Sequence, residues 1–99
     1  MSTSVSTHVL DTGRGEPARG VLVELFQGDE LVATGVTDAD GRLRLAEDLE
    51  PATYRLVFHP ASPAFFSRVE LEISLDEAGK NFHVPLLVSP FSCTSYRGS

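Results

Sequence analysis

The sequence has 99 residues but no tryptophan, a single methionine and a single cysteine, Cys93. One cysteine excludes an internal disulfide framework and a zinc site built from several cysteines. The chain also has no run of the ~20 apolar residues that a membrane-spanning helix needs. Residues 1–5 carry no positive charge ahead of an apolar stretch, so they do not resemble a signal peptide. These absences predict a cytoplasmic protein that does not contact a membrane.

Positive charge is scarce as well. Lysine and arginine total 8 against 14 aspartate and glutamate residues, which gives a formal net charge of −6 with histidine neutral. Nucleic acids and anionic membrane surfaces bind proteins through clustered positive charge. We therefore exclude nucleic acid and membrane as partners.

The length leaves room for one domain, because domains usually need ~100 residues or more. The sequence shows no low-complexity linker and no internal repeat. We expect a single domain over residues 1–99. Its hydrophobic core should be thin, since a chain of this size buries only ~65% of its unfolded surface.

Apolar residues recur with a period of two, which is typical of strands with one solvent-facing side. The clearest run is 69–75, where Val69, Leu71, Ile73 and Leu75 alternate with polar residues. Pro85 cannot donate a ladder hydrogen bond, so its strand should lie at a sheet edge or be interrupted there. Similar runs occur at four other places in the chain, 20–27, 31–37, 54–58 and 82–89.

Glycine and proline mark the joints between these runs. Asp38-Ala-Asp-Gly41 resembles the start of a calcium loop, but the remaining ligands do not follow at the required spacing. A tight turn with Gly41 at positive φ is predicted instead. Ser74 to Asn81 is the one helix candidate, because acidic residues near its start and Gly79 near its end suit helix caps. Seven to eight short strands with one short helix predict an all-β sandwich.

Two histidines are candidates for acid–base chemistry, because histidine titrates near neutral pH. His8 lies in the first predicted strand and His83 in the last long one, between two apolar neighbours. A lone strand histidine is more often a hydrogen-bonded surface residue, but two of them favour a shared site. Arg42 could hold an anion or polarise a carbonyl, or it could only pair with Asp38 or Glu47.

The last ten residues are unusual for a chain terminus, because they contain Tyr96, Arg97 and several hydroxyl groups. No Gly-x-Ser-x-Gly pattern marks a serine nucleophile, and Cys93 is interpreted as an inert thiol. His59, beside Pro60, is assigned to a loop. The histidines and the cysteine lack the spacing of metal ligands, so no metal is predicted.

Four strings resemble one known family, the 5-hydroxyisourate hydrolases, which are transthyretin-related enzymes of urate breakdown. Their order and spacing are similar to the family's over nearly the whole chain. The terminal tetrapeptide is the most specific, because it separates these enzymes from transthyretin, a hormone carrier of the same fold. The stretch between Phe58 and Val69 is shorter than in typical members. The strings are Ser6-Thr-His-Val-Leu-Asp11, Thr37-Asp-Ala-Asp-Gly-Arg42, Phe82-His-Val-Pro-Leu-Leu87 and Tyr96-Arg-Gly-Ser99.

The resemblance implies a transthyretin-like (prealbumin-like) β-sandwich that assembles as a homotetramer, a dimer of dimers. It implies hydrolysis of 5-hydroxyisourate to 2-oxo-4-hydroxy-4-carboxy-5-ureidoimidazoline, a step of purine degradation from urate to allantoin, without a cofactor. The family's catalytic residues fall on His8, Arg42 and His83. Its substrate-binding tail falls on Tyr96, Arg97, Gly98 and Ser99.

Opening a cyclic amide with water needs an activated water, a stabilised oxyanion and a protonated leaving nitrogen. The two histidines suit the proton transfers and Arg42 suits the oxyanion, but the sequence leaves open which histidine is the base. Two other interpretations stay open, a non-catalytic transthyretin-like carrier of a small ligand and a sandwich that serves as an interaction module. His8 and the terminal tetrapeptide count against the carrier.

Overall fold

The chain folds almost entirely into strands, as its period-two pattern predicts. The computed structural model describes residues 3–61 and 64–98, which contain nine strands and no helix, so no described segment can cross a membrane as a helix. Seven strands are long and two, β2 and β9, have three residues or fewer. In chain order the strands are β1 (Thr3–Asp11), β2 (Glu16–Pro17), β3 (Leu22–Gln27), β4 (Glu30–Val36), β5 (Arg42–Leu49), β6 (Ala52–His59), β7 (Val69–Leu75), β8 (Asn81–Val88) and β9 (Cys93–Ser95).

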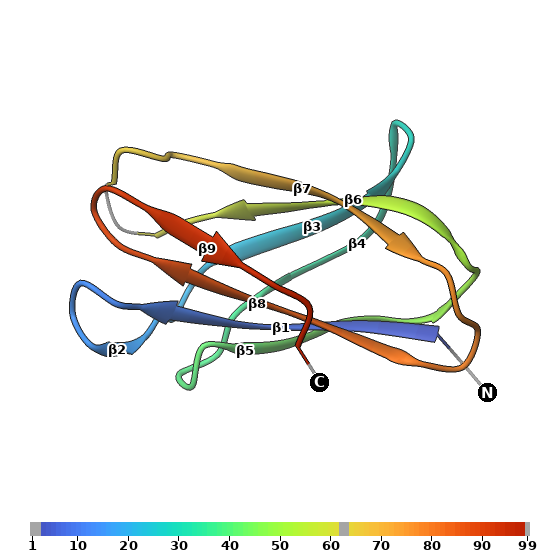
Figure 1. Cartoon of the computed structure of the whole chain (residues 1–99), viewed down its shortest axis with the longest axis horizontal. Helices are drawn as coiled ribbons and strands as arrows, with labels where there is room; N and C mark the ends of the chain where they lie inside the picture. Colours follow the sequence, from blue (N-terminus) through green and yellow to red (C-terminus); the bar gives the residue numbers. More distant parts are fainter. Residues whose placement is uncertain (1–2, 62–63, 99) are drawn as a thin grey trace.

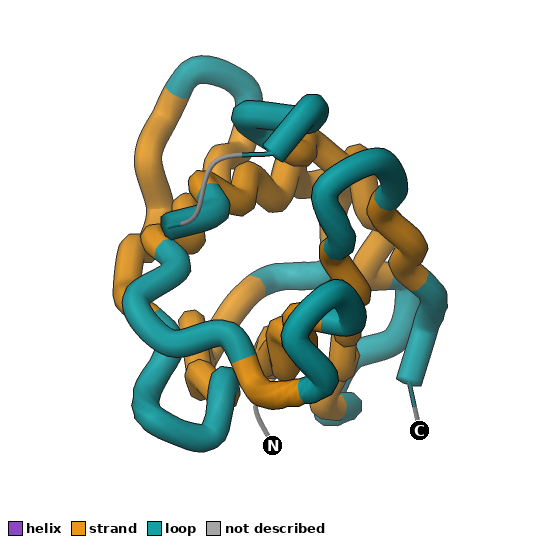
Figure 2. The backbone as a smooth tube through the Cα atoms, turned by 90° about the vertical axis from the view of Figure 1, so that its left-hand side faces the viewer, coloured by secondary structure: helices purple, strands orange, loops and turns teal. Residues whose placement is uncertain are grey.

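The strands form two sheets that pack face to face (Figure 1, and end-on in Figure 2). One sheet has the order β2-β1-β8-β9, and β5 pairs with β1 beside β2. The other sheet has the order β4-β3-β6-β7. Strands β1 and β8 run parallel, and the remaining pairs are antiparallel. The predicted all-β sandwich is confirmed.

The core lies between the sheets and is formed by the residues of the alternating strands that point inward. Each fully buried leucine, valine or phenylalanine contributes about 1.5–3 kcal/mol relative to an exposed one. The opposite, wet face of β1 and β8 is left for polar residues, which is where the predicted histidines lie. The fully buried apolar residues come from β1, β3 and the residue before it, β6, β7 and β8: Val5, Val9, Val21, Val23, Leu25, Leu56, Phe58, Leu75 and Leu86.

The predicted short helix over residues 74–81 is wrong. Ser74 and Leu75 pair with β6 as the last residues of β7, and Asn81 already pairs with β1 as the first residue of β8. Only five residues, 76–80, remain for the connection, and they form a turn. Five residues are too few to repay the cost of starting a helix.

Pro85 is tolerated inside β8 because the ladder is interrupted beside it. Strand β9 pairs with β8 only as far as Leu86, and the next contact on that side is the bridge from His83 to Gly98. Because Pro85 lies between these two contacts, its missing N–H costs no ladder hydrogen bond. The prediction of an edge or a broken strand is only partly right, because β8 runs unbroken through Pro85 beside β1 and the interruption is confined to its pairing on the β9 side. His59, expected in a loop, is instead the last residue of β6.

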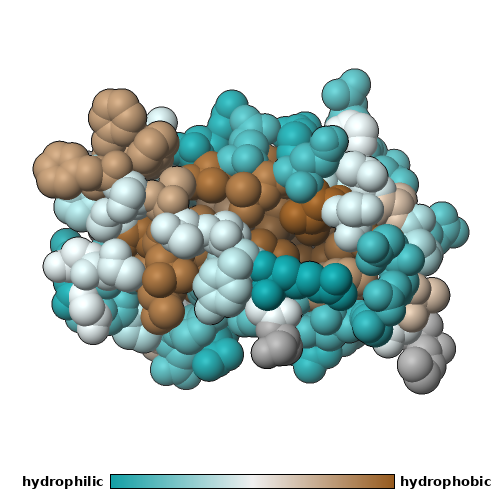
Figure 3. Space-filling view, viewed as in Figure 1, coloured by the Kyte–Doolittle hydropathy of each residue, from teal (hydrophilic) through white to brown (hydrophobic). Residues whose placement is uncertain are grey.

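The two sheets separate along one long side of the molecule. Between β7 and β9, residues including Leu71, Ile73 and Phe82 line a cavity of about 300 Å³. The apolar surface in the middle of Figure 3 lies in this gap. Both bordering strands end the order of their sheets, so this side of the core is only partly covered by the chain itself.

One end of the sandwich, which we call the loop end, is formed by the β6–β7 and β8–β9 connections. The Phe65 N–H donates to the Pro90 carbonyl at 2.9 Å and ties the two connections together. Phe65 and Phe91 are 77% and 85% exposed, and apolar groups protrude at this end in Figure 3. The loop end therefore carries aromatic side chains that the core does not cover.

Candidate active site

The predicted catalytic residues lie on the outer face of the sheet that contains β5, β1 and β8. These three strands are neighbours, with β1 in the middle (Figure 1). A groove of about 620 Å³ opens on this face. It is bordered by Ser6, Asp38, Arg42, Asn81 and His83 among others.

Strand register brings the predicted residues together. His8 of β1 lies opposite Arg42 of β5 in the antiparallel pair, and Ser6 of β1 lies opposite His83 of β8 in the parallel pair. His8 and Ser6 are two positions apart, so they share one face of β1. Residues from three distant parts of the chain therefore lie on one surface, where Arg42 and His83 border the groove and His8 lies beside Arg42 without bordering it.

The turn before β5 sets the position of His8. Gly41 has φ of +74°, and a Cβ there would overlap the carbonyl oxygen of Val9 on β1. Only glycine allows this close approach, in which the Val9 N–H donates to the Gly41 carbonyl at 2.7 Å. The contact places the Asp40 carbonyl 2.9 Å from His8 Nε2. The predicted turn thus serves as a support for the histidine.

Asp38 organises the same turn and the start of β5. Its Oδ1 accepts hydrogen bonds from the Asp40 N–H at 2.9 Å and the Arg42 N–H at 3.0 Å. The bond from the Arg42 backbone lowers the pKa of the Asp38 carboxyl below its ordinary value. The carboxylate stays charged and holds the backbone of Arg42, not its guanidinium.

Arg42 itself is exposed at the edge of the groove. The alternative partner predicted for it, Glu47, is 2.7 Å from the guanidinium of Arg44. The contact with Asp38 uses the Arg42 backbone. This arrangement favours the view that the Arg42 guanidinium serves the groove.

His83 is half-buried and its ring is held from the side by a serine. Nδ1 of His83 lies 2.9 Å from the Ser6 hydroxyl oxygen. Burial lowers the pKa of the His83 imidazole, and the positive charges of His8 and Arg42 lower this pKa further. The ring is therefore biased toward its neutral form, which can both accept and donate hydrogen bonds.

The residues of the C-terminal tail lie on two different sides of the sheet. The Gly98 N–H donates to the His83 carbonyl at 2.7 Å, and a Cβ at Gly98 would lie 2.7 Å from Cδ2 of the His83 ring. Arg97 instead stacks over the ring of the buried Phe82, at 4.7 Å from its centroid. Tyr96 and Arg97 border the cavity between β7 and β9. Ser99 lies outside the described residues.

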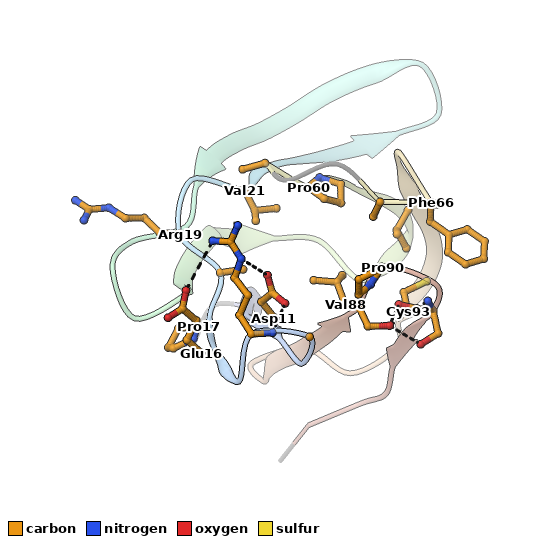
Figure 4. Close-up of a pocket in the computed structure, with 18 residues that line it drawn as sticks. Asp11, Glu16, Pro17, Arg19, Val21, Pro60, Phe66, Val88, Pro90 and Cys93 are labelled. Carbon is orange, nitrogen blue, oxygen red and sulfur yellow. Dashed lines mark hydrogen bonds and ion pairs between the residues drawn. The ribbon is translucent and has the colours of Figure 1, made fainter.

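A second cavity, of about 420 Å³, opens near the loop end and holds none of the predicted catalytic residues. Val21 and Pro60 face Val88 and Pro90 across it (Figure 4). Arg14 bridges Asp11 and Glu16 at its rim, and Cys93 lines its floor. Within residues 3–61 and 64–98, no three histidine, cysteine, aspartate or glutamate side chains gather as a metal site.

Sequence reasoning assigned no role to three groups of the site. Period two places Ser6 on the same strand face as His8, and Asn81 on the same face as His83, but no function was predicted for either side chain. The Asp40 carbonyl is a backbone group, and no side-chain pattern announces it. The hydrogen bonds that these groups make can be identified only when the pairing register of the strands is known.

The chain is similar to known proteins over nearly its whole length. The family described as HIUase/Transthyretin, with HIUase denoting hydroxyisourate hydrolase, matches residues 5–98. The 5-hydroxyisourate hydrolase of Pseudomonas aeruginosa is 38% identical, over 96% of this chain and 90% of that protein. The structure of Klebsiella pneumoniae 5-hydroxyisourate hydrolase is 33% identical with a TM-score of 0.86, over 98% and 94% of the two chains. Transthyretin from Sparus aurata is 27% identical with a TM-score of 0.84, over 95% of each.

The similarity includes a difference in length. The alignment with the Pseudomonas protein has 114 positions. It includes 96% of the 99 residues of this chain, which is about 95 residues. About 19 positions of that alignment therefore have no counterpart in this chain. The shorter chain still forms the nine strands and the groove described above.

Proposed function

The chain belongs to the HIUase/Transthyretin family, and from this premise we propose how its groove works. The protein is a hydrolase that opens the six-membered ring of 5-hydroxyisourate in urate degradation. The observation that carries this assignment is the full-length similarity to curated 5-hydroxyisourate hydrolases from bacteria and mouse, at 37–38% identity. The reacting groups we assign are His8, Arg42 and His83.

The groove supports this assignment chemically. Neutral imidazoles can activate water and return its proton to the leaving nitrogen, which contributes about 100- to 10,000-fold in comparable enzymes. Arg42 is a fixed cation that can bind the substrate's oxygens and stabilise the oxyanion. We assign Tyr96, Arg97, Gly98 and Ser99 to substrate binding, with Gly98 already against the His83 ring.

We further propose that residues 1–99 act as one transthyretin-like domain in a cytoplasmic homotetramer, a dimer of dimers. The cavity between β7 and β9 supports assembly, because a second copy could cover the partly exposed core there. Light scattering should give the mass of four chains. A monomeric mass would contradict the assembly.

The alternative of a non-catalytic carrier is less well supported. A transthyretin is also a structural neighbour, but at lower sequence identity than the hydrolases. A carrier needs no two histidines and no arginine on one face of a sheet. Binding of the substrate without turnover would favour the carrier.

The experiment that tests the function follows the ultraviolet absorbance of 5-hydroxyisourate, generated in situ by urate oxidase. We expect the protein to accelerate the decay well beyond the spontaneous rate. Removal of residues 96–99 should abolish the acceleration with the fold intact, whereas an interaction module would tolerate that truncation. Decay at the spontaneous rate with folded full-length protein would refute the hydrolase.

A further inference from the structure

A row of polar side chains runs along the outer face of β1 and β8 and ends at His83. Ser4 and Asn81 are register partners in this parallel pair, as are Ser6 and His83. The Ser4 hydroxyl lies 2.7 Å from Asn81 Oδ1, Asn81 Nδ2 lies 3.1 Å from the Ser6 oxygen, and that oxygen lies 2.9 Å from His83 Nδ1. The four side chains form one continuous chain of hydrogen bonds.

The chain has a direction, because each group has a limited set of donors. Asn81 Oδ1 can only accept, so the Ser4 hydroxyl donates to it. Asn81 Nδ2 can only donate, so the Ser6 oxygen accepts from it. The Ser6 oxygen keeps a second lone pair, but within the described part of the chain Nδ1 of His83 is the only group placed to accept its proton, so we assign the Ser6 hydroxyl as the donor to Nδ1.

Two further contacts restrict the His83 ring. Gly98 leaves no room beside Cδ2, and its N–H is bonded to the His83 carbonyl. Burial lowers the pKa of the His83 ring, and the positive charge of Arg42 lowers it further, so the neutral ring is favoured. A neutral ring that accepts at Nδ1 carries its single proton on Nε2.

We propose that Ser4, Asn81 and Ser6 are positioning residues that fix neutral His83 with its proton on Nε2, so that His83 acts as a hydrogen-bond donor. The catalytic half of this statement rests on the proposed function. The only lone pair of the ring is engaged by Ser6, so His83 is not the group that takes a proton from water.

The same reasoning assigns the proton transfers to His8. Its Nε2 lies 2.9 Å from the Asp40 carbonyl, which can only accept, so Nε2 carries the proton and the lone pair is on Nδ1. In the hydrolysis, the water oxygen bonds to the ring carbonyl carbon, and one water proton passes to His8 Nδ1. The bond from that carbon to the ring nitrogen breaks, and His8 returns the proton to the nitrogen. His83 keeps its proton and stabilises the developing oxyanion together with Arg42.

Nitrogen-15 NMR of the histidine rings tests the arrangement without substrate. At a pH where His83 is neutral, we expect a pyridine-like shift for its Nδ1 and a pyrrole-like shift for its Nε2. A proton on Nδ1 of His83 would overturn the proposal.

The substitution Asn81→Asp reverses the direction of the relay. It replaces the Nδ2 donor with an oxygen that can only accept, so the Ser6 hydroxyl turns toward residue 81 and His83 must donate from Nδ1. We expect the His83 tautomer to switch and kcat to fall about 10- to 100-fold, as happens when partners that orient metal-bound histidines are removed. An unchanged tautomer would contradict the relay. A thermal melt compared with that of the wild-type protein shows whether the variant is folded.

Ser6→Ala and Ser6→Thr form the matched pair that separates positioning from packing. The alanine variant removes the donor, so the two tautomers should mix and kcat should fall while KM changes little. The threonine variant keeps the hydroxyl and should restore both the single tautomer and most of kcat. Equal kcat in Ser6→Ala and the wild type would overturn the catalytic half of the proposal.

The two proposals fail in different ways. The expected nitrogen shifts in a protein that does not accelerate 5-hydroxyisourate decay would refute the proposed function and support the relay. Rapid turnover with the proton of His83 on Nδ1 would support the function and refute the relay.

Discussion

The groove and the loop end of this sandwich are built in opposite ways. On the groove face, His83 and His8 lie on strands of fixed register, and each ring is held by a hydrogen bond at 2.9 Å. At the loop end, Phe65 and Phe91 project from connections and stay largely exposed. A shift of one residue in the register of β1 would turn His8 toward the core. The position of Phe65 and Phe91 does not depend on a strand register in this way, because they lie in connections.

This contrast explains how the chain is shorter than its relatives and still keeps the groove. About 19 aligned positions of the Pseudomonas hydrolase have no counterpart here, and the sequence predicts the shortening between Phe58 and Val69. That segment joins β6 to β7, in the sheet that does not carry the groove. Length can therefore change at the loop end without moving His8, Arg42 or His83.

The strongest test of the contrast is His83→Ala. Removing the ring should lower kcat by about 100- to 1,000-fold, because a hydrogen-bond donor to the developing oxyanion is lost. The half-exposed position should leave the melting temperature nearly unchanged. Stopped-flow absorbance with 5-hydroxyisourate measures the effect, and near-normal turnover would remove His83 from the mechanism.

Arg42→Ala should have the next largest effect. Loss of one oxyanion donor costs about 3–4 kcal/mol in comparable sites, or about 100- to 1,000-fold in kcat. Arg19→Ala removes the same side chain near the loop end and should leave kcat unchanged. The same kinetic assay compares the two variants, and equal losses would show that only overall charge matters.

Gly41→Ala should disturb the turn whose Asp40 carbonyl holds the His8 ring. Strain at positive φ costs about 1–3 kcal/mol, and overlap with the Val9 carbonyl adds to it. Gly28→Ala is the matched control, because Gly28 also has positive φ but an added Cβ there meets nothing within 4 Å. Urea unfolding should show a clearly larger loss for Gly41. Equal losses of unfolding free energy in the two variants would mean that the close approach of the turn to β1 does not contribute to stability.

The charge environment of His83 predicts a pH effect with a definite sign. The pKa of His83 is lower in the folded chain than its ordinary value of ~6.5. As the pH falls through that value, the unfolded chain therefore binds more protons than the folded chain does. The free energy of unfolding decreases as a result. Arg42→Gln removes a positive charge and should raise the pKa of His83. An NMR titration of the His83 ring measures both values, with Arg19→Gln as the control. A pKa that falls in Arg42→Gln would contradict the account.

The smallest effect is expected for Phe91→Ser. The side chain is mostly exposed, so unfolding free energy should change by less than about 0.5 kcal/mol and kcat should not change. A urea unfolding curve and the absorbance assay measure both quantities. A large loss of activity would show that the loop end takes part in the site.

Much of the fold followed from the sequence because its strands alternate cleanly. Val69 to Leu75 could be assigned from period two alone, and His8, Arg42 and His83 were named from motif strings before their register was known. The helix at 74–81 was wrong because capping signals are local and strand pairing of Ser74 and Asn81 is not. The relay through Ser6 depends on which strands are neighbours, and a single sequence does not show this.

The most direct test of the central claim compares the groove and the loop end in one assay. Urate oxidase generates 5-hydroxyisourate, and its decay is followed with the wild-type protein, the triple variant His8→Ala, Arg42→Ala, His83→Ala, and the double variant Phe65→Ser, Phe91→Ser, after circular dichroism shows each to be folded. We predict rapid decay with the wild type and the loop-end variant, and the spontaneous rate with the groove variant. Wild-type turnover by the groove variant, or spontaneous decay with the folded wild type, would contradict the account.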